Sequence, residues 1–459
     1  MKPRILLVNP PISDVAAFDL WARPLGLYIW AARLRQWGFR VAMIDCTDRL
    51  YPRLPDNNIK QRKDGRGYYY NEPMAERPEP VRLARRRFKR YGLPPDSFRA
   101  ALSDAQESLG GRPDMVLMTT RMTYWYHAAV ETARILCEEL GRQIPLVVGG
   151  IYASLMPGHA RQVIRPDMLL EGPALETLPK LLEEKFEQAG LDGRSVSPEI
   201  ADWPSPAYGL MHDRTALPIL TSVGCPGHCS YCAARTLWDR GFHRMKPKLA
   251  AERIVKLQED FGTRHFAFYD DALLAMPEQW FDPFLEALLE KHLDVHFHLP
   301  NGIHYAPLSD ERAARMCQAG FHTIRLSLES TRAERLESYR REGSNDDFRQ
   351  AVAALREAGY EQCQVGAYVL AGTPGQTVDE VREAIDFVHD CGAHVRLCEY
   401  SPIPGTHDWN AAMKASGGAL EREPLWQNNN LYYHRPEAPI GPEAFEELKE
   451  RVKQGRVCR

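Results

Sequence analysis

The stretch TSVGCPGHCSYCAART (residues 221–236) places Cys225, Cys229 and Cys232 within eight positions. Structural zinc usually takes two spaced pairs of ligands, and no second pair follows here. A four-iron cluster needs one ligand for each iron, so three thiolates leave one iron open to a small molecule. We therefore expect these cysteines to hold a [4Fe-4S] cluster. Zinc, with His228 or a distant cysteine as its fourth ligand, is the alternative.

The composition of the whole chain agrees with reduced thiols. Of 459 residues, 44% are hydrophobic and 26% charged, and the net charge of −3 gives no reason to expect nucleic acid or anionic lipid as a partner. No stretch approaches the roughly 18 apolar residues of a membrane span, and the first residues lack the features of a signal peptide. We expect a cytoplasmic protein whose seven scattered cysteines are not paired in disulfides.

Strand and helix patterns alternate over residues 1–190, which predicts an α/β domain with a doubly wound parallel sheet. Ligands of such sheets lie beyond the carboxyl ends of the strands. The loops of interest therefore begin at Asn9, Thr119, Gly149 and Glu171. The predicted strands are 4–11, 40–45, 114–120, 145–150 and 167–172, and the predicted helices are 24–39, 124–140 and 174–187.

Residues 46–112 interrupt this alternation with a polar excursion that contains the basic run VRLARRRFKRYG (81–92). The first interpretation is a solvated amphipathic helix on the surface, because charge runs usually face water. A docking surface for an acidic substrate or partner is the second interpretation. Nucleic-acid binding has the least support, since one basic helix in a slightly acidic protein is a weak signal.

A linker is expected over residues 191–212, and a second alternating series follows over 213–404. Its strands are predicted at 217–222, 265–269, 295–299, 322–328, 363–370 and 394–399, with helices between them. Six β/α units fall short of the eight of a closed barrel, so we expect a partial barrel. The cysteines follow its first strand, at the face where barrels carry out chemistry. Residues 405–459 are predicted to be a C-terminal tail with helical patches.

The pattern CxxxCxxC with an aromatic residue, Tyr231, before the third cysteine resembles the radical S-adenosylmethionine (SAM) superfamily. The resemblance implies that the open iron chelates SAM and that an electron from the cluster cleaves it to a 5′-deoxyadenosyl radical. It also implies an external electron donor, such as flavodoxin or ferredoxin. In such enzymes the cofactor supplies the chemistry, and the protein supplies position and exclusion of water.

Three features after the cysteines resemble the SAM contacts of that superfamily. FAFYDDALL (266–274) ends the second barrel strand with two acids, IRLSLES (324–330) ends the fourth with one, and YVLAGTPGQT (368–377) resembles the turn near the adenine. A following arginine, Arg340 or Arg341, is a candidate for the SAM carboxylate. The resemblance thus implies SAM contacts at Asp270, Asp271, Glu329, Arg340, Gly372, Pro374 and Gly375.

The third barrel strand carries HFHLPNGIHY (296–305), in which His296 and His298 share one side. Asn301 and His304 follow at the catalytic face. Ordinary hydrogen-bonded barrel residues are one interpretation. Contact with the reacting groups is the other, and it makes Tyr231, Asn301 and His304 the catalytic candidates.

The first domain resembles that of the superfamily branch whose N-terminal domain binds cobalamin. The similarity lies in NPP (9–11), PLGLYIWAARLRQWGFRVAMID (24–45), VVGGIYASLMP (147–157) and EGPALETLPKLLE (171–183). The DxHxxG sequence that supplies a lower imidazole to cobalt is absent, so the resemblance implies cobalamin without a histidine ligand, or a domain that binds none. The implied contacts are Pro10, Thr119, Gly149, Gly150, Tyr152, Ser154 and Glu171.

The resulting hypothesis is a cobalamin-dependent radical SAM enzyme that methylates an unactivated carbon of a small molecule or peptide, with a second SAM remethylating cobalamin. The first alternative keeps both cofactors for a ring closure or oxidation. A second alternative is a non-catalytic iron–sulfur and cobalamin carrier. A transfer-RNA methylthiotransferase is less consistent, because no N-terminal cysteine set or C-terminal RNA-binding module is recognisable.

Overall fold

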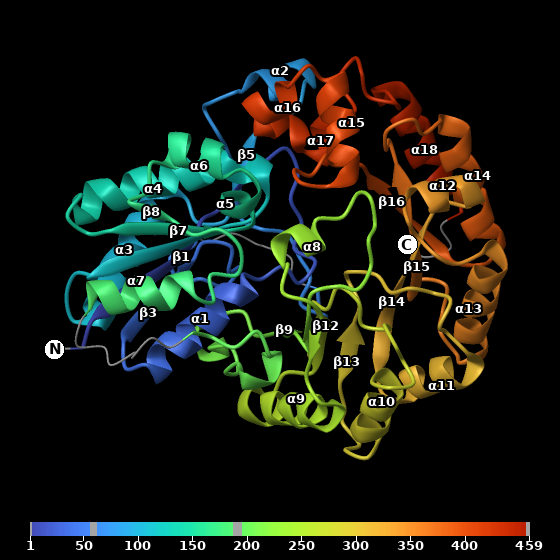
Figure 1. The fold of residues 1–459 in the computed structure, drawn as a ribbon, viewed down its shortest axis with the longest axis horizontal. Coiled ribbons are helices and arrows are strands. Elements are labelled where there is room, and N and C mark those ends of the chain that lie inside the picture. The colour runs from blue at the N-terminus through green and yellow to red at the C-terminus, as the bar shows by residue number, and fades with distance from the viewer. Residues whose placement is uncertain (1, 56–61, 187–194, 456–459) are drawn as a thin grey trace. The chain divides into compact units, whose positions relative to one another are not determined.

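The computed structural model describes residues 2–55, 62–186 and 195–455, which form two compact units (Figure 1). Unit 1 comprises Met1–Arg214 and Leu420–Gln427, and unit 2 comprises Thr215–Ala419 and Asn428–Arg459. The predicted linker, 191–212, falls within the span of unit 1, and its first residues, 191–194, lie outside the described residues.

Unit 1 contains a five-stranded parallel sheet in the order β3-β1-β6-β7-β8. Alternate residues of β1 supply its two faces: Ile5 and Leu7 pack with α1 and α7, while Leu6 and Val8 pack with α3 and α4 (Figure 1). The predicted α/β fold is confirmed. The elements are β1 (Arg4–Asn9), α1 (Leu25–Gln36), β3 (Arg40–Asp45), α3 (Pro95–Leu109), β6 (Met115–Thr120), α4 (Tyr126–Leu140), β7 (Leu146–Gly150), α5 (Ile151–Leu155), α6 (Pro157–Ile164), β8 (Met168–Leu169) and α7 (Thr177–Lys185).

The excursion at 46–112 is more structured than its polarity suggests. The basic run is not one helix: α2 (Glu79–Leu83) ends early, and β5 (Lys89–Tyr91) pairs with β2 (Ile12–Asp14) and β4 (Asn71–Pro73). The reason is Arg90, which is buried and forms ion pairs with Glu72 and Glu131. The excursion also contains α3, which completes the β3–α3–β6 crossover.

A buried ring of ion pairs ties this excursion to the chain just before unit 2. Asp19 accepts from Arg23 Nη1 at 2.5 Å and lies 2.8 Å from Arg49 Nε. Asp213 completes the ring, with Oδ2 at 3.1 Å from Arg23 Nη2 and 2.8 Å from Arg49 Nη2. All four side chains are at most 2% exposed, so each charge is balanced inside unit 1 rather than by water.

Unit 2 contains six parallel strands in chain order, β9-β12-β13-β14-β15-β16, and this open sheet confirms the predicted partial barrel. Thr377 and Glu380 form the predicted capping box at the start of α14. The strands are β9 (Ala216–Ile219), β12 (His265–Phe268), β13 (His296–His298), β14 (Phe321–Glu329), β15 (Val365–Ala371) and β16 (His394–Glu399). The helices between them are α9 (Pro247–Phe261), α10 (Phe281–Leu289), α11 (Asp310–Gln318), α12 (Ala333–Ser338), α13 (Asn345–Glu357) and α14 (Val378–Asp390).

The described part of the predicted tail, 405–455, is divided between the two units. Helices α15 (His407–Ala415), α17 (Asn429–Tyr432) and α18 (Pro442–Gln454) belong to unit 2, while Leu420–Gln427 belongs to unit 1. No sequence pattern indicates this division, because short, irregular helices carry little periodicity. Among the described residues, no helix has the length and apolarity needed to cross a membrane.

Candidate active site

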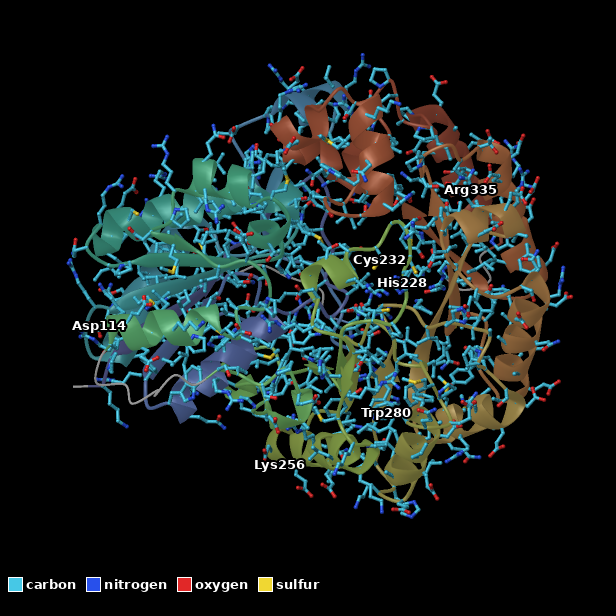
Figure 2. All side chains as sticks on the ribbon, viewed as in Figure 1. Asp114, His228, Cys232, Lys256, Trp280 and Arg335 are labelled. Carbon is cyan, nitrogen blue, oxygen red and sulfur yellow. The ribbon has the colours of Figure 1, made fainter. Side chains whose placement is uncertain are left out.

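The cysteine loop lies between the short strand β10 (Ser222–Val223) and α8 (Ala234–Leu237), with His228 and Cys232 labelled in Figure 2. Backbone N–H groups point at two of the sulfurs: Gly227 N is 3.4 Å from Cys225 Sγ, and Ala234 N is 3.5 Å from Cys232 Sγ. Desolvation raises the pKa of Cys232 to about 11. A nearby positive charge, such as that of a metal centre, would favour the thiolate form.

The three cysteines lie in one loop but are not arranged around a single point. The described residues contain no group of three or more His, Cys, Asp or Glu side chains placed to hold a metal ion. A cubane binds each sulfur through a different iron, so its ligands need not converge on one point. An ideal Cβ on Gly227 would lie 3.4 Å from Cys225 Sγ, which shows how closely the backbone wraps the sulfurs.

An open hollow of about 580 Å³ adjoins the three cysteines and has a cationic rim. Arg235, Arg340 and the histidines His228 and His407 line it, and none of its lining residues is acidic. His228 is held by Arg235, whose Nη1 lies 2.7 Å from Nε2. That contact directs the imidazole toward a guanidinium rather than toward the sulfurs.

The two predicted aspartates at the end of β12 have different surroundings. Asp270 is buried and accepts hydrogen bonds from Thr221 N, from Thr221 Oγ1 at 2.7 Å and from Ser222 Oγ at 2.5 Å. It therefore fixes the start of the cysteine loop. Asp271 is exposed, and desolvation together with the charge of Asp270 raises its pKa to about 6. Of the pair, Asp271 is the one available to a ligand.

Glu329 stands at the end of β14 with a left-handed backbone, φ 67°, and is 6% exposed. Burial raises its pKa to about 7, while Arg341 and hydrogen bonds from Tyr231 and Ser327 act in the opposite direction. Arg341 also donates to Ser327 O at 2.8 Å and lies 3.8 Å from Cys229 Sγ. The structure thus brings Tyr231, Glu329 and Arg341 to the cysteine loop.

Arg340 and Arg341 are adjacent in sequence but occupy different places. Arg340 has a left-handed backbone, φ 54°, and is exposed on the rim of the hollow. Arg341 lies beside Glu329. The sequence could not distinguish the two, because the choice depends on the turn after α12.

The glycine–proline turn after β15 is held by hydrogen bonds with the side chain of Gln376. Gln376 Oε1 accepts from Gly372 N at 2.8 Å and from Thr373 N at 3.2 Å, and its Nε2 donates to Leu370 O. Gly372 has φ 91°, and an ideal Cβ there would lie 3.2 Å from Phe445 of α18. The predicted contacts Gly372, Pro374 and Gly375 therefore belong to one fixed loop.

The histidines of β13 form part of a cluster at the amino ends of the strands. His298 is buried, with Nδ1 at 2.9 Å from Thr323 Oγ1 and Nε2 at 3.1 Å from His265. The rings of His265 and His296 stack at 5.0 Å. These contacts favour the interpretation as hydrogen-bonded barrel residues.

Asn301 and His304 lie beyond the carboxyl end of β13. Asn301 Nδ2 donates to Tyr269 O at 2.9 Å. His304 Nε2 lies 2.9 Å from Glu342 O, and Ala306 N donates to its Nδ1 at 3.3 Å. Desolvation and Arg341 lower the pKa of His304, so this ring is neutral near pH 7. Backbone groups contact both ring nitrogens of His304. Of Asn301 and His304, Asn301 therefore has more capacity to contact a ligand.

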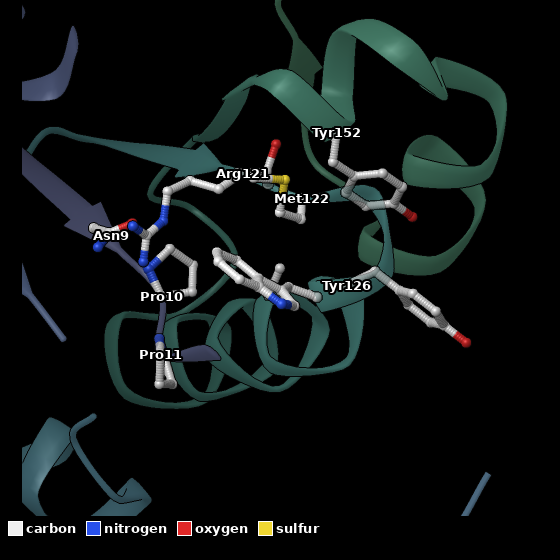
Figure 3. Close-up of a pocket in the computed structure, with 10 residues that line it drawn as sticks. Asn9, Pro10, Pro11, Arg121, Met122, Tyr126 and Tyr152 are labelled. Atoms are coloured by element: carbon white, nitrogen blue, oxygen red, sulfur yellow. The ribbon is translucent and has the colours of Figure 1, made fainter. Parts of the chain in front are cut away.

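In unit 1 the strand order reverses between β1 and β6, and a pocket opens at that point (Figure 3). Arg121 extends toward Asn9 and Pro10, while Tyr126 and Tyr152 lie at the other end (Figure 3). Predicted Pro10 and Tyr152 line this pocket. The full lining is Asn9, Pro10, Pro11, Thr120, Arg121, Met122, Trp125, Tyr126, Ala129 and Tyr152.

The other predicted residues of unit 1 build the edge of the sheet near the pocket. Gly150 has φ 97°, and an ideal Cβ there would lie 2.2 Å from Thr120 O. Ser154 joins two loops, donating to Gly150 O and accepting from Gly172 N, both at 2.8 Å. Thr119 pairs with Gly149 across the sheet, and Glu171 forms an exposed ion pair with Arg161 at 2.7 Å.

A family model described as the radical SAM superfamily matches residues 219–388. The chain carries a radical SAM domain. The matched range includes the cysteine loop, the β12 aspartates, Glu329 and the glycine–proline turn. In the radical SAM domain, sequence reasoning did not single out Arg335 and Tyr339, which no motif marks. It also passed over Thr373 and Gln376, although both lie in the quoted stretch YVLAGTPGQT.

Curated relatives of this chain share limited identity. It is 26% identical over 183 residues to the anaerobic magnesium-protoporphyrin IX monomethyl ester cyclase of Synechocystis sp., covering 40% of this chain and 35% of the relative. It is 22% identical over 317 residues to the bacteriochlorophyllide d C-8(2)-methyltransferase of Chlorobaculum tepidum, covering 64% and 67%. The first match thus spans about a third of the cyclase.

A solved structure extends the similarity to both units. The radical SAM methyltransferase TsrM from Kitasatospora setae has a TM-score of 0.64 and 17% identity, covering 91% of this chain and 77% of its own. TsrM has been solved with tryptophan substrate and aza-SAM, and with cobalamin and a [4Fe-4S] cluster. At this identity the comparison shows that the radical SAM domain and unit 1 share the fold of a cobalamin-dependent radical SAM methyltransferase.

Proposed function

We propose that this protein is a cobalamin-dependent radical SAM enzyme that methylates an unactivated carbon of a small molecule or peptide. The observation that carries the proposal is the combination, in one chain, of a three-cysteine loop at the end of β10 and a pocket at the reversal point of a doubly wound sheet. Neither feature alone distinguishes this class from other radical SAM or nucleotide-binding proteins.

In unit 2, Cys225, Cys229 and Cys232 would hold the cluster, with Gly227 N and Ala234 N donating to the sulfurs. When bound and reduced, the cluster supplies the electron that cleaves SAM. Glu329 and Arg341 place one acidic and one basic side chain beside this loop, next to Tyr231 and Cys229. They match the amino and carboxylate groups of SAM in charge, and Asp271 offers a further acceptor.

In unit 1, cobalamin would bind at the pocket between β1 and β6, whose lining includes Pro10 and Tyr152, with Gly149 and Gly150 at the adjoining edge of the sheet. Bound cobalamin supplies the methyl group that is transferred to the substrate. We also propose that cobalamin binds without an imidazole ligand to cobalt, because the chain lacks the DxHxxG sequence that supplies one. Arg121, the only charged side chain in the lining of the described pocket, would contact the bound cobalamin.

The decisive experiment uses methyl-labelled SAM with protein purified and reconstituted without oxygen. Reduced protein with its substrate should form 5′-deoxyadenosine and S-adenosylhomocysteine, and label should enter the product. Separate iron–sulfur and corrinoid bands in the visible spectrum would identify both cofactors. Unlabelled product with continued release of 5′-deoxyadenosine would exclude methylation.

A ring closure is the second candidate, because the Synechocystis relative is named a cyclase. The same labelling experiment separates the two, since a cyclase leaves the label in SAM and its cleavage products. An external one-electron donor of the flavodoxin or ferredoxin type is required in either case. The reduced thiols that this chemistry needs fit a reducing compartment such as the cytoplasm.

A further inference from the structure

Tyr339 connects two parts of the radical SAM domain that lie more than a hundred residues apart in sequence. It follows α12 and is 2% exposed. Its carbonyl accepts a hydrogen bond from Ser230 N of the cysteine loop at 3.1 Å. Its hydroxyl lies 2.6 Å from Thr373 Oγ1 in the glycine–proline turn. One residue therefore contacts both loops.

The aromatic ring of Tyr339 adds a third contact. It meets the ring of Tyr231 edge to face, with centroids 5.4 Å apart and an angle of 85° between planes. Tyr231 precedes Cys232 directly and bonds to Glu329. The backbone, hydroxyl and ring of Tyr339 are thus all engaged by residues of the predicted SAM site.

Helix α12 holds the glycine–proline turn at a second point. Arg335 donates to Gly375 O at 2.8 Å and to Pro374 O at 3.3 Å, and its guanidinium is fixed by Glu380 in a bidentate pair at 2.8 and 3.0 Å. Figure 2 labels Arg335 on this helix. The turn is therefore anchored to α12 by a charged side chain and by the Tyr339 hydroxyl.

We propose that Tyr339 is a positioning residue that fixes the cysteine loop against the glycine–proline turn, and so sets the spacing at which SAM is held at its two ends. The inference rests on the proposed function for the identity of the ligand. A ligand that is bound at both ends binds most tightly when the two binding loops already have the correct separation in the free protein. No binding free energy is then used to order these loops.

A second tyrosine of the same unit provides a matched control. Tyr360, after α13, is also 2% exposed, and its hydroxyl has no hydrogen-bond partner in the described structure. Tyr339→Phe and Tyr360→Phe each remove one buried hydroxyl, but only the first removes a link between the two loops. Thr373→Val removes the same link from the other side, together with the contact of Thr373 Oγ1 with Gln376 Oε1 at 3.3 Å, and Thr373→Ser retains a hydroxyl.

The test measures SAM affinity by equilibrium dialysis of labelled SAM against oxidised, cluster-loaded protein, which requires no turnover. Tyr339→Phe and Thr373→Val should each weaken binding about fivefold, the factor that corresponds to one hydrogen bond of about 1 kcal/mol. The double variant should bind no worse than Thr373→Val alone. Thr373→Ser and Tyr360→Phe should bind like the wild type.

Thermal unfolding of the cluster-free variants separates positioning from general stability. If Tyr339→Phe binds SAM like the wild type, or if its effect adds fully to that of Thr373→Val, the inference is wrong. If Tyr339→Phe does not fold, Thr373→Val with its serine control decides the question. Wild-type protein that binds SAM without cleaving it would contradict the proposed function and leave this inference standing, whereas failure to bind SAM would overturn both.

Discussion

The two candidate sites of this protein are built in opposite ways. In unit 2, three thiols are presented by a loop, and backbone N–H groups and glycines lie close to their sulfurs. In unit 1, the edge of the sheet can select a ligand mainly by its shape. Its polar side chains are largely used within the protein, as when Asn9 donates to Asp45 at 2.6 Å and Thr120 donates to Gly149 O at 2.8 Å.

This difference explains what each site reveals about its ligand. A set of three thiolates restricts the choice of cofactor through coordination chemistry. A pocket lined mainly by aromatic, proline and backbone groups restricts only the size and shape of its ligand. The predictions below use the contrast, and they begin with the change of largest expected effect.

Cys229→Ala should abolish cluster binding, because two thiolates cannot replace three. Iron and sulfide content should fall to background after reconstitution, and SAM cleavage should cease. The corrinoid spectrum should persist, since the pocket in unit 1 uses none of these residues. Cys317→Ala, at an exposed cysteine on α11, is the control. Loss of corrinoid binding in Cys229→Ala alone would show that the two sites are not independent.

Gly150→Ala should damage unit 1 and leave the cluster intact. A methyl group at φ 97°, with Thr120 O at 2.2 Å, should lower the free energy of unfolding by about 2–4 kcal/mol. Denaturant unfolding would measure this loss, together with weaker cobalamin binding. Gly158→Ala is the matched control, because a Cβ there meets nothing within 4 Å and the site is helical. Equal effects from both variants would refute the steric argument.

Glu329 should give SAM binding a pH dependence that the unit 1 pocket lacks. Its pKa of about 7 means that the carboxylate is mostly protonated at pH 6 and mostly ionised at pH 8. If the ionised form receives the SAM amino group, affinity should rise about tenfold over this range. Glu329→Gln should bind weakly at every pH. Equilibrium dialysis across the range measures this, and an unchanged slope in the variant would assign the titration to another group.

Glu423, which bonds to Tyr126 beside the unit 1 pocket, should have the smallest effect. Burial raises its pKa, so the folded state holds the proton more tightly than the unfolded chain. This contribution to stability is present at low pH and is lost as pH rises through the folded-state value. Glu423→Gln should keep the hydrogen bond and flatten that decline by less than about 1 kcal/mol. If the stability difference between Glu423→Gln and the wild type were the same at acid and neutral pH, this assignment would be wrong.

Much of the fold and half of the site were predictable from sequence, for identifiable reasons. Many strands of the two sheets are short apolar runs, such as β1 (RILLVN), and their pattern is strong. Cys225 follows the short strand β10 within two residues, and Glu329 is the last residue of β14. The contacts of Tyr339, Arg335 and Arg341 depend on the path of the chain after β14, which no periodicity records. In strand β5, Arg90 forms ion pairs with Glu72 and Glu131. Such long-range pairs are not recorded in local strand or helix propensity.

The assignment of Leu420–Gln427 to unit 1 has a consequence for how the protein is made. Gln427 is fully buried, with Nε2 at 3.0 Å from Met156 Sδ and 2.9 Å from Leu420 O, and its Oε1 contacts Thr123 Oγ1. A ribosome releases this segment only after the whole radical SAM domain, residues 219–388, has been synthesised. Until then, nascent unit 1 lacks its last segment. A premature stop codon before position 420 would therefore remove part of unit 1 as well as part of unit 2.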